Sequence, residues 1–422
     1  MDDFDGQRND DSRNDDSDMR TSQSWIIAGL MLIVPTASSA QLLPGVQQAV
    51  PDLIGRAGDT LDGAGLDRLS PARLADRLAA VRAARIDTML RNHGDRIELD
   101  DRREPARRGV ILLTGVDGGM IDTLRAAGYG VDSMMIEGLD LPVTRLTTHK
   151  GRSLAKALRD VRRLAPRAQV SADNLYFPSG PALPLTTGTL AAGRIEGRAA
   201  GLIDGGVARH PALTGPIEQR GFAEGAPRAS AHGTAVASLI SGDGVVKGAS
   251  PGAPLLVADV YGADPAGGGA FALVRALGWM AARGVPVVTV SLVGPANPLL
   301  DGAIRLARDK GVMVVAAVGN DGPAAPPAYP ASYPGVIAVT GIDGRGRLLP
   351  EAGRALHVDF AAPGADMQAG TVNGGKGPVR GTSFAAPLVA GRLFARGSIA
   401  ALRAEATRGK PPVLCADCRN KD

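Results

Sequence analysis

The sequence predicts an α/β fold in which a mainly parallel sheet lies between helices, preceded by a small α+β unit. Three short apolar runs carry the first half of this prediction, at residues 255–260, 285–292 and 311–318, and the segments between them have the length of helices. A strand that is apolar on both faces is typical of a parallel sheet covered by helices on each side. We therefore expect these runs to be strands of one buried sheet.

The composition indicates a globular chain with a core of small aliphatic side chains. Of the 422 residues, 44% are hydrophobic and only 3% are aromatic, while 56 Gly and 30 Pro mark many turns. The Gly and Pro follow no fixed period, which excludes a collagen-like chain, and the hydrophobic content excludes wholesale disorder. The formal charge is +4, but the arginines are not interleaved with aromatic residues. A nucleic-acid partner is therefore not expected.

Residues 1–40 are predicted to be an acidic leader followed by a secretory signal. Residues 1–18 hold eight Asp against two Arg, and residues 25–34 form an apolar run that is too short to span a bilayer. Small residues follow this run up to Ala40, where cleavage is expected. Translation from Met19 would remove the acidic leader, and a buried core helix is the alternative interpretation of the run. The signal predicts a periplasmic or secreted protein, anchored to the membrane if it stays uncleaved.

Three further segments precede the predicted sheet. Residues 41–108 are expected to be helical, because Ser70 and Pro71 form a typical helix start ahead of an amphipathic pattern. Residues 109–177 alternate between strand-like and helix-like stretches, which predicts the α+β unit. Residues 178–200 have the Pro, Gly, Thr and Ala content of a linker. The apolar face of the amphipathic helix consists of Leu74, Leu78, Val81, Ile86 and Leu90.

The order of the histidines limits the catalytic arrangements that are open to Ser383. The chain has five histidines, and none of them follows this serine. An α/β-hydrolase places its histidine after the nucleophile, so that arrangement is excluded. The order Asp, His, Ser remains open, and Asp204, His232 and Ser383 supply it.

The local sequence around each of these residues suits the chemistry. Asp204 ends a short apolar run, and the carboxyl edge of a parallel sheet is where such folds place reactive groups. His232 and Ser383 each begin a predicted helix, where unpaired backbone N–H groups favour negative charge. Asn320 follows a buried strand, and its amide could donate to an oxyanion. Each pattern alone is more often a turn or a cap, but the four together indicate one site.

The motifs around these four residues resemble those of the subtilisin-like serine peptidases, the subtilases. The motifs are IDGGV, HGTAVASLISG, AAVGNDGP and GTSFAAPLVAG, and the resemblance covers about residues 195–407. It implies a three-layer α/β/α catalytic domain at 201–407 that hydrolyses polypeptides through an acyl-enzyme. Ser383 would be the nucleophile, His232 the general base and then acid, and Asp204 the group that orients the imidazole. Asn320 and the backbone N–H of Ser383 would bind the oxyanion.

The resemblance also implies how the substrate is bound and how the enzyme is made. Residues 109–177 are similar in pattern to the inhibitory propeptides of the family, so this unit would block the groove of a zymogen until the chain is cut within 178–200. Val293 and Gly205 depart from the residues that are usual in the family, and Gly205 could cost Asp204 one hydrogen bond. The expected substrate-binding residues are Ser291, Leu292, Val293, Gly294 and Gly319.

The carboxyl end, residues 408–422, is predicted to be a short tail. Cys415 and Cys418 form a lone Cys-x-x-Cys pair without a second pair of metal ligands, so a local disulfide is favoured over zinc. No cofactor, metal site or membrane span beyond the signal segment is expected. Two other functions stay open: a catalytically silent binding protein on a subtilase scaffold, and a serine esterase that uses the same site.

Overall fold

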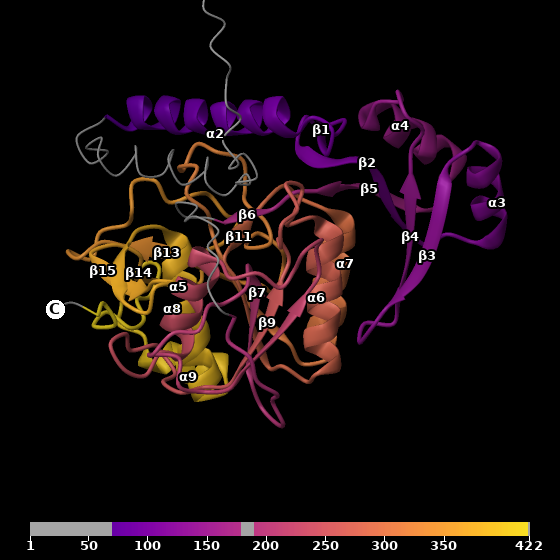
Figure 1. The fold of residues 1–422 in the computed structure, drawn as a ribbon. Coiled ribbons are helices and arrows are strands. Elements are labelled where there is room, and N and C mark those ends of the chain that lie inside the picture. The colour runs from indigo at the N-terminus through magenta and orange to yellow at the C-terminus, as the bar shows by residue number, and fades with distance from the viewer. Residues whose placement is uncertain (1–69, 179–189, 421–422) are drawn as a thin grey trace, which may run out of the picture. The chain divides into compact units, whose positions relative to one another are not determined.

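A seven-stranded sheet forms the centre of the larger part of the chain (Figure 1). The structure, a computed structural model, describes residues 70–178 and 190–420. The predicted leader and signal, residues 41–69 of the predicted helical region and residues 179–189 of the linker therefore lie outside it. The strand order is β14-β13-β12-β10-β7-β9-β8, and every pairing within this sheet is parallel, as the apolar runs predict. The strands are β7 (Ala200–Asp204), β8 (Ile217–Gly221), β9 (Leu255–Asp259), β10 (Val287–Val290), β12 (Met313–Ala317), β13 (Ile337–Ile342) and β14 (Phe360–Pro363).

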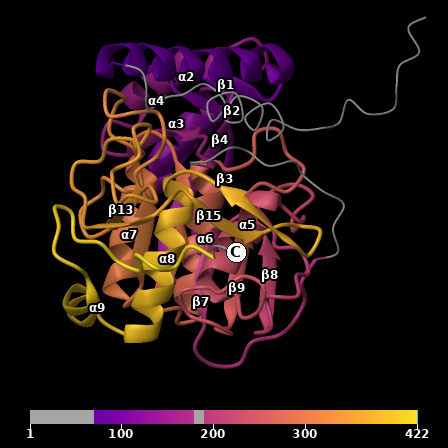
Figure 2. The same ribbon diagram turned by 90° about the vertical axis from the view of Figure 1, so that its left-hand side faces the viewer.

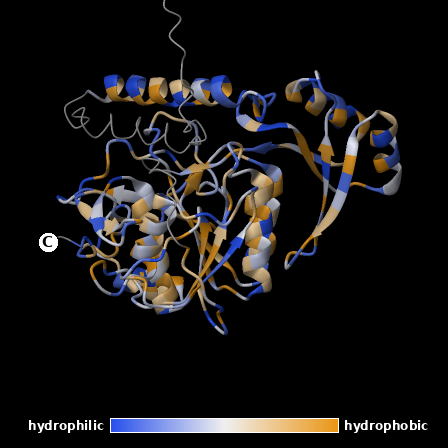
Figure 3. Ribbon diagram, viewed as in Figure 1, coloured by the Kyte–Doolittle hydropathy of each residue, from blue (hydrophilic) through white to orange (hydrophobic). Residues whose placement is uncertain are grey.

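Helices cover both faces of this sheet, which confirms the three-layer α/β/α arrangement. One face packs against α6 (Ala270–Ala282) and α7 (Pro298–Asp309), and the other against α5 (Ala231–Ser241) and α8 (Thr382–Arg396) (Figure 1). Successive strand residues point to opposite faces, so Leu202 lies in one core and Ile203 in the other. Figure 3 shows the central strands coloured mainly as hydrophobic.

The amino-terminal part folds as an antiparallel sheet with two helices, which is an α+β unit. Its strands are β1 (Ile97–Leu99), β2 (Pro105–Thr114), β3 (Gly130–Ile136), β4 (Leu141–Thr147) and β5 (Gln169–Asn174). Its helices are α3 (Gly118–Ala126) and α4 (Leu154–Leu164). The predicted boundary at residue 109 falls inside β2, because the arginines at 107 and 108 hide the apolar pattern of this strand.

The predicted amphipathic helix is α2 (Pro71–His93). Ser70 is its N-cap and Pro71 opens its first turn, although the Ser70 side chain makes no capping hydrogen bond. Leu78 and Met89 are fully buried on its inner face. None of the helices in the described parts of the chain is both long and apolar enough to cross a membrane.

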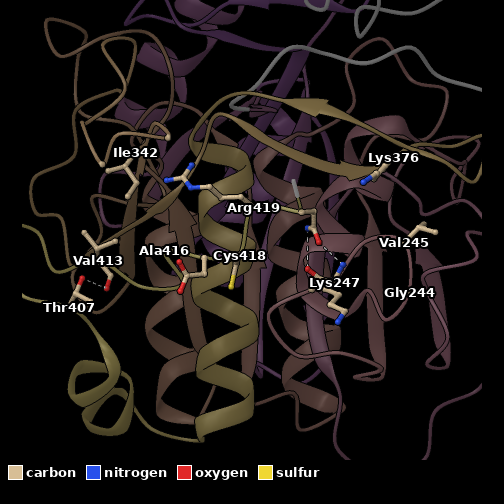
Figure 4. Close-up of a pocket in the computed structure, with 15 residues that line it drawn as sticks. Gly244, Val245, Lys247, Ile342, Lys376, Thr407, Val413, Ala416, Cys418 and Arg419 are labelled. Carbon is tan, nitrogen blue, oxygen red and sulfur yellow. Dashed lines mark hydrogen bonds between the residues drawn. The ribbon is translucent and has the colours of Figure 1, made fainter. Parts of the chain in front are cut away.

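The carboxyl end packs against the large domain. The short helix α9 (Ile399–Glu405) follows α8, and Figure 2 shows both in yellow. Cys415 and Cys418 are joined as a disulfide, the favoured alternative. The guanidinium of Arg419 donates to the carbonyls of Ala365 and Asp343 at 2.7 Å each. A cavity of about 1010 Å³ lies beside this segment and β16 (Lys376–Val379), and no predicted catalytic residue lines it (Figure 4).

Candidate active site

Asp204 and His232 form a buried hydrogen-bonded pair. Asp204 is the last residue of β7, and His232 lies in the first turn of α5, whose N-cap is Ser230. Nδ1 of His232 lies 2.9 Å from each carboxylate oxygen of Asp204, and the Gly205 N–H donates to Oδ1 at 2.7 Å. Asp204 is 0% exposed and His232 is 2% exposed. Such a carboxylate fixes the orientation of the imidazole and stabilises its charged form.

Gly205 lies where a larger residue would collide with Ser230. A Cβ atom on Gly205 would lie 2.5 Å from the Ser230 Cβ and 2.7 Å from its Oγ. Ser230 accepts a hydrogen bond from the Gly233 N–H at 3.1 Å, and this bond caps α5. Ser230 therefore occupies the space that a side chain at position 205 would need, which explains why glycine fits there.

Ser383 lies in the first turn of α8, next to Ser291, which directly follows β10. Oγ of Ser383 donates to the Ser291 carbonyl at 3.1 Å, and Oγ of Ser291 donates to the Ser383 carbonyl at 2.9 Å. Pro387 lies four residues after Ser383 inside α8 and has no N–H to donate to that carbonyl. The Ser291 hydroxyl therefore replaces the missing helical donor.

The histidine and the serine belong to the same site but are not hydrogen-bonded to each other. The His232 ring packs against Phe384, the neighbour of Ser383, with ring centroids 5.6 Å apart. Within the described parts of the chain, no group hydrogen-bonds the buried Nε2 of His232. Catalytic hydrogen bonds of this kind often form only when substrate is bound. Asp204 thus occupies Nδ1 of the ring, and Nε2 is the nitrogen that another group could still contact.

Asn320 is held against the start of α8. The Thr382 N–H donates to Oδ1 of Asn320 at 3.0 Å, so Oδ1 is the accepting end of the amide and Nδ2 its donor. The Thr382 hydroxyl lies 3.1 Å from both the N–H and the carbonyl of Gly319, which adopts a φ of 88°. Thr382 was not predicted as a site residue, although it lies inside the quoted serine motif.

A second carboxylate, Asp259, lies beside Asp204 at the sheet edge. The two residues are in register on β9 and β7. Burial raises the pKa of Asp259, whereas three backbone N–H donors, from residues 228, 261 and 262, act in the opposite direction. Because these donors join its oxygens to the loop after β9 and to the segment ahead of α5, Asp259 shapes the edge of the site.

The predicted substrate-binding strand pairs with a segment of this same chain. The strand β6 (Phe177–Pro178) runs antiparallel to β11 (Leu292–Val293), so these two predicted residues face residues 177 and 178. Val293 also contacts the other side of the site, since its side chain lies 3.4 Å from the position that a Cβ on Gly319 would take. The remaining predicted residue, Gly294, pairs with Tyr329.

Tyr176 anchors this segment through three hydrogen bonds. Its N–H donates to the Gly268 carbonyl at 2.8 Å, and its carbonyl accepts from the Tyr261 hydroxyl at 2.7 Å. Its own hydroxyl donates to the Pro295 carbonyl at 2.7 Å, and the side chain is fully buried. A Cβ on Gly294 would lie 2.7 Å from the Tyr176 ring, so glycine is needed there.

The α+β unit contacts the amino ends of both helices on its side of the sheet. Asp173 accepts from the Phe271 N–H of α6 at 2.9 Å, and Asn297, the N-cap of α7, donates to the Ala172 carbonyl at 2.9 Å. Arg107 adds an ion pair to Asp264 at 2.6 Å. Burial raises the pKa of the Asp173 carboxyl, and the charge of Arg107 acts in the opposite direction.

Comparison with known proteins assigns the family. The sequence model of the subtilase family matches residues 197–396. Subtilisin BL from Lederbergia lenta is 34% identical over 202 residues, which cover 45% of this chain and 72% of that protein. The chain belongs to the subtilase family. The resemblance in the sequence motifs is thereby confirmed, and the family is one of serine-type peptidases.

Other relatives match a smaller share of their own length. The major intracellular serine protease of Bacillus subtilis (strain 168) is 33% identical to this subtilase over 170 residues, which are 38% of this chain and 53% of that protein. The chain spans 66% of subtilisin amylosacchariticus from Bacillus subtilis subsp. amylosacchariticus, at 28% identity and with 56% of this chain covered. It thus spans less than two thirds of these two relatives.

Solved structures support the subtilase fold. Fervidolysin from Fervidobacterium pennivorans, described as a keratinolytic enzyme related to subtilisin, has a TM-score of 0.58 at 20% identity and covers 74% of this chain and 61% of its own. The epidermin leader peptide processing serine protease from Staphylococcus aureus has a TM-score of 0.53 at 16% identity, covering 71% and 93% of the two chains. At these identities the likeness concerns the fold alone.

Proposed function

We propose that this subtilase is an exported serine endopeptidase, made as a zymogen, that hydrolyses peptide bonds through an acyl-enzyme on Ser383. The observation that carries the proposal is the buried Asp204–His232 pair, 2.9 Å apart, in the same site as Ser383 and Asn320. The family assignment supports the peptidase activity. Polypeptides are the proposed substrates.

In the proposed reaction, Oγ of Ser383 attacks the carbonyl carbon of the scissile bond. Its proton passes to Nε2 of His232, so Ser383 must first give up its hydrogen bond to the Ser291 carbonyl. Asp204, bonded to Nδ1, stabilises the imidazolium that forms. His232 then protonates the leaving amine as the C–N bond breaks, and water hydrolyses the acyl-enzyme in the reverse sequence of proton transfers.

The oxyanion of the tetrahedral intermediate would accept hydrogen bonds from Nδ2 of Asn320 and the backbone N–H of Ser383. The bond from the Thr382 N–H to Oδ1 supports this role, because it makes Oδ1 the accepting end of the amide and so assigns Nδ2 as its donor. Such fixed donors stabilise charge that develops only in the transition state, and therefore raise turnover more than binding.

The contacts of residues 175–178 support the zymogen part of the proposal. This segment lies along β11, the proposed substrate-binding strand, and Tyr176 fixes it to the loops at Gly268 and Pro295. Ser383 is 0% exposed in this state. The α+β unit that carries the segment would keep substrate out until the chain is cut within 178–200. Export rests on the predicted signal at residues 25–40, which lies outside the described residues.

A paired expression experiment tests the proposal. The full chain and its Ser383→Ala variant are expressed with export intact, and each is examined for size, amino-terminal sequence and labelling by a fluorophosphonate. We expect the parent chain to lose its signal, to be cut within 178–200 and to label on Ser383. The Ser383→Ala chain is expected to keep its pro-region and to remain unlabelled.

The same experiment separates the alternative functions. A parent chain that keeps its full length and never labels, even after an added protease has cut the linker, would favour the silent binding protein. An esterase would label but would hydrolyse ester substrates without cleaving a casein or peptide substrate. Recovery of all the protein inside the cell with residues 1–40 intact would overturn the proposed export.

A further inference from the structure

The helix α2 contacts the loop that carries Asn320. Leu78 of α2 is 1% exposed, and its Cδ1 lies 2.6 Å from the position that a Cβ on Gly322 would take. Gly322 is two residues after Asn320 and has a φ of 86°, so both its conformation and the leucine favour glycine there. Leu78, the most buried leucine of α2, thus packs against the loop that carries Asn320, the proposed oxyanion donor.

Two arginines of α2 bind the carboxylate that follows Asn320. Nη2 of Arg85 lies 3.3 Å from both oxygens of Asp321, and Nε of Arg82 lies 3.5 Å from Oδ2. These groups are only partly exposed, at 16% for the Arg85 side chain, 30% for Arg82 and 27% for Asp321. Arg82 also pairs with Glu104 at 2.9 Å, so it links α2 to the α+β unit as well.

Arg85 and Met89 also contact the segment that pairs with β11. The Arg85 guanidinium lies 5.6 Å from the centre of the Phe177 ring, within cation–π range. Met89 is 2% exposed and packs in one cluster with Leu175 and Phe177. Arg85 therefore connects α2 both to residues 175–178 and to the loop that carries Asn320.

We infer that α2 is a second inhibitory element, which locks residues 175–178 and the Asn320 loop into the closed state. This inference rests on the proposed function and names the regulation of that same site. The α+β unit forms hydrogen bonds to the amino ends of α6 and α7. The helix α2, by contrast, contacts the loop that carries Asn320 directly, through Asp321. Loss of α2 from the loop would remove its contacts with Phe177 and Asp321 together. Exposure of Ser383 in the uncut chain thus depends on the Arg85–Asp321 contact.

The rate at which a fluorophosphonate labels the uncut, full-length chain measures this closed state. The uncut species is separated by size, and its early labelling rate reports the fraction of molecules with an accessible Ser383. We expect Arg85→Gln and Asp321→Asn each to raise that rate about fivefold, the order of a partly exposed ion pair. Leu78→Ala is expected to raise it about 30-fold or more, since it truncates a buried leucine. The double variant Arg85→Gln/Asp321→Asn should raise the rate by less than the product of the two single effects, because both variants remove the Arg85–Asp321 contact.

Arg77→Gln is the matched control, because Arg77 is an exposed arginine on the same helix and its loss changes the charge equally. We expect it to label at the parent rate. If Arg85→Gln and Leu78→Ala also label at the Arg77→Gln rate, while the chain cut within 178–200 labels well, α2 is not inhibitory and the proposed function stands. If neither the uncut nor the cut chain labels, the proposed function itself fails.

Discussion

Ser291 and Ser383 exchange two hydrogen bonds, each hydroxyl donating to the other residue's carbonyl, at 2.9 and 3.1 Å. The exchange depends on Pro387, which cannot supply the helical N–H that the Ser383 carbonyl would otherwise accept. The backbone of the proposed nucleophile is therefore held by a residue 92 positions earlier in the chain.

The variant Ser291→Ala should destabilise the protein and slow catalysis. It leaves the buried Ser383 carbonyl without the Ser291 donor, and a buried polar group that loses its partner costs about 1 to 3 kcal/mol. We expect a lower thermal midpoint and a lower kcat for a peptide substrate, with KM little changed. Ser241→Ala is the control, because the Ser241 hydroxyl donates at 3.4 Å to a carbonyl inside α5, where a helical N–H is also present. Equal losses in the two variants would contradict the argument.

Asn320→Ala should reduce turnover with little effect on substrate binding. Loss of one oxyanion donor costs on the order of 10²- to 10³-fold in kcat. The variant also removes the acceptor of the Thr382 N–H, so its thermal midpoint should be compared with that of the parent chain. Steady-state kinetics of the cut enzyme provide the test. A change confined to KM would show that Asn320 binds substrate instead.

The sequence predicts the central sheet and the candidate site because both leave local patterns. Strands β9, β10 and β12 are apolar on both faces and therefore stand out, and Asp204, His232 and Ser383 each lie at a predicted strand end or helix start. The edge strand β8, with sequence IEQRG, is missed because three of its five residues are polar. The strand β4, with sequence LPVTRLT, is missed because a proline and two consecutive polar residues break the alternation that is typical of a strand.

Contacts between distant segments leave no such pattern. Leu78 belongs to the predicted apolar face of α2, but nothing near it in the sequence indicates that Gly322 is its neighbour. The pairing of residues 177 and 178 with β11 likewise joins segments more than 100 positions apart. Their partners are decided by the packing of whole elements.

Gly205→Ala should impair the Asp204–His232 pair. The new Cβ would lie 2.5 Å from the Ser230 Cβ, so Ser230, the N-cap of α5, has to move and His232 with it. We expect the fluorophosphonate labelling rate of the cut enzyme to fall about tenfold or more. Adding Ser230→Gly should restore part of the rate, because glycine removes the clash and is still tolerated as an N-cap. Gly302→Ala in α7 is the control, since the nearest atom to its Cβ is 3.9 Å away. A Gly205→Ala enzyme that labels at the parent rate would refute the clash.

Glu218→Gln should lower stability more at neutral pH than in acid. Arg283 binds Glu218 at 2.5 and 3.1 Å, and both side chains also bind the backbone of Ile195. The hydrogen bond from Arg283 lowers the pKa of Glu218. A carboxyl whose pKa is lowered on folding stabilises the fold above its unfolded pKa, about 4.3, and this contribution is lost as the pH falls through the folded value.

Thermal unfolding of the Ser383→Ala background, which avoids self-cleavage, measures this effect at pH 7 and at about pH 3. At pH 7 we expect Glu218→Gln to cost up to about 1 kcal/mol, as is usual for a partly exposed pair. At about pH 3 the gap should be smaller, because the stabilising contribution of the carboxylate declines as the pH falls below about 4.3 toward its lowered folded pKa. Glu196→Gln, an exposed glutamate next to Ile195, should show no gap at either pH. A gap for Glu218→Gln that is equally large at both pH values would show that its charge does not stabilise the start of the domain.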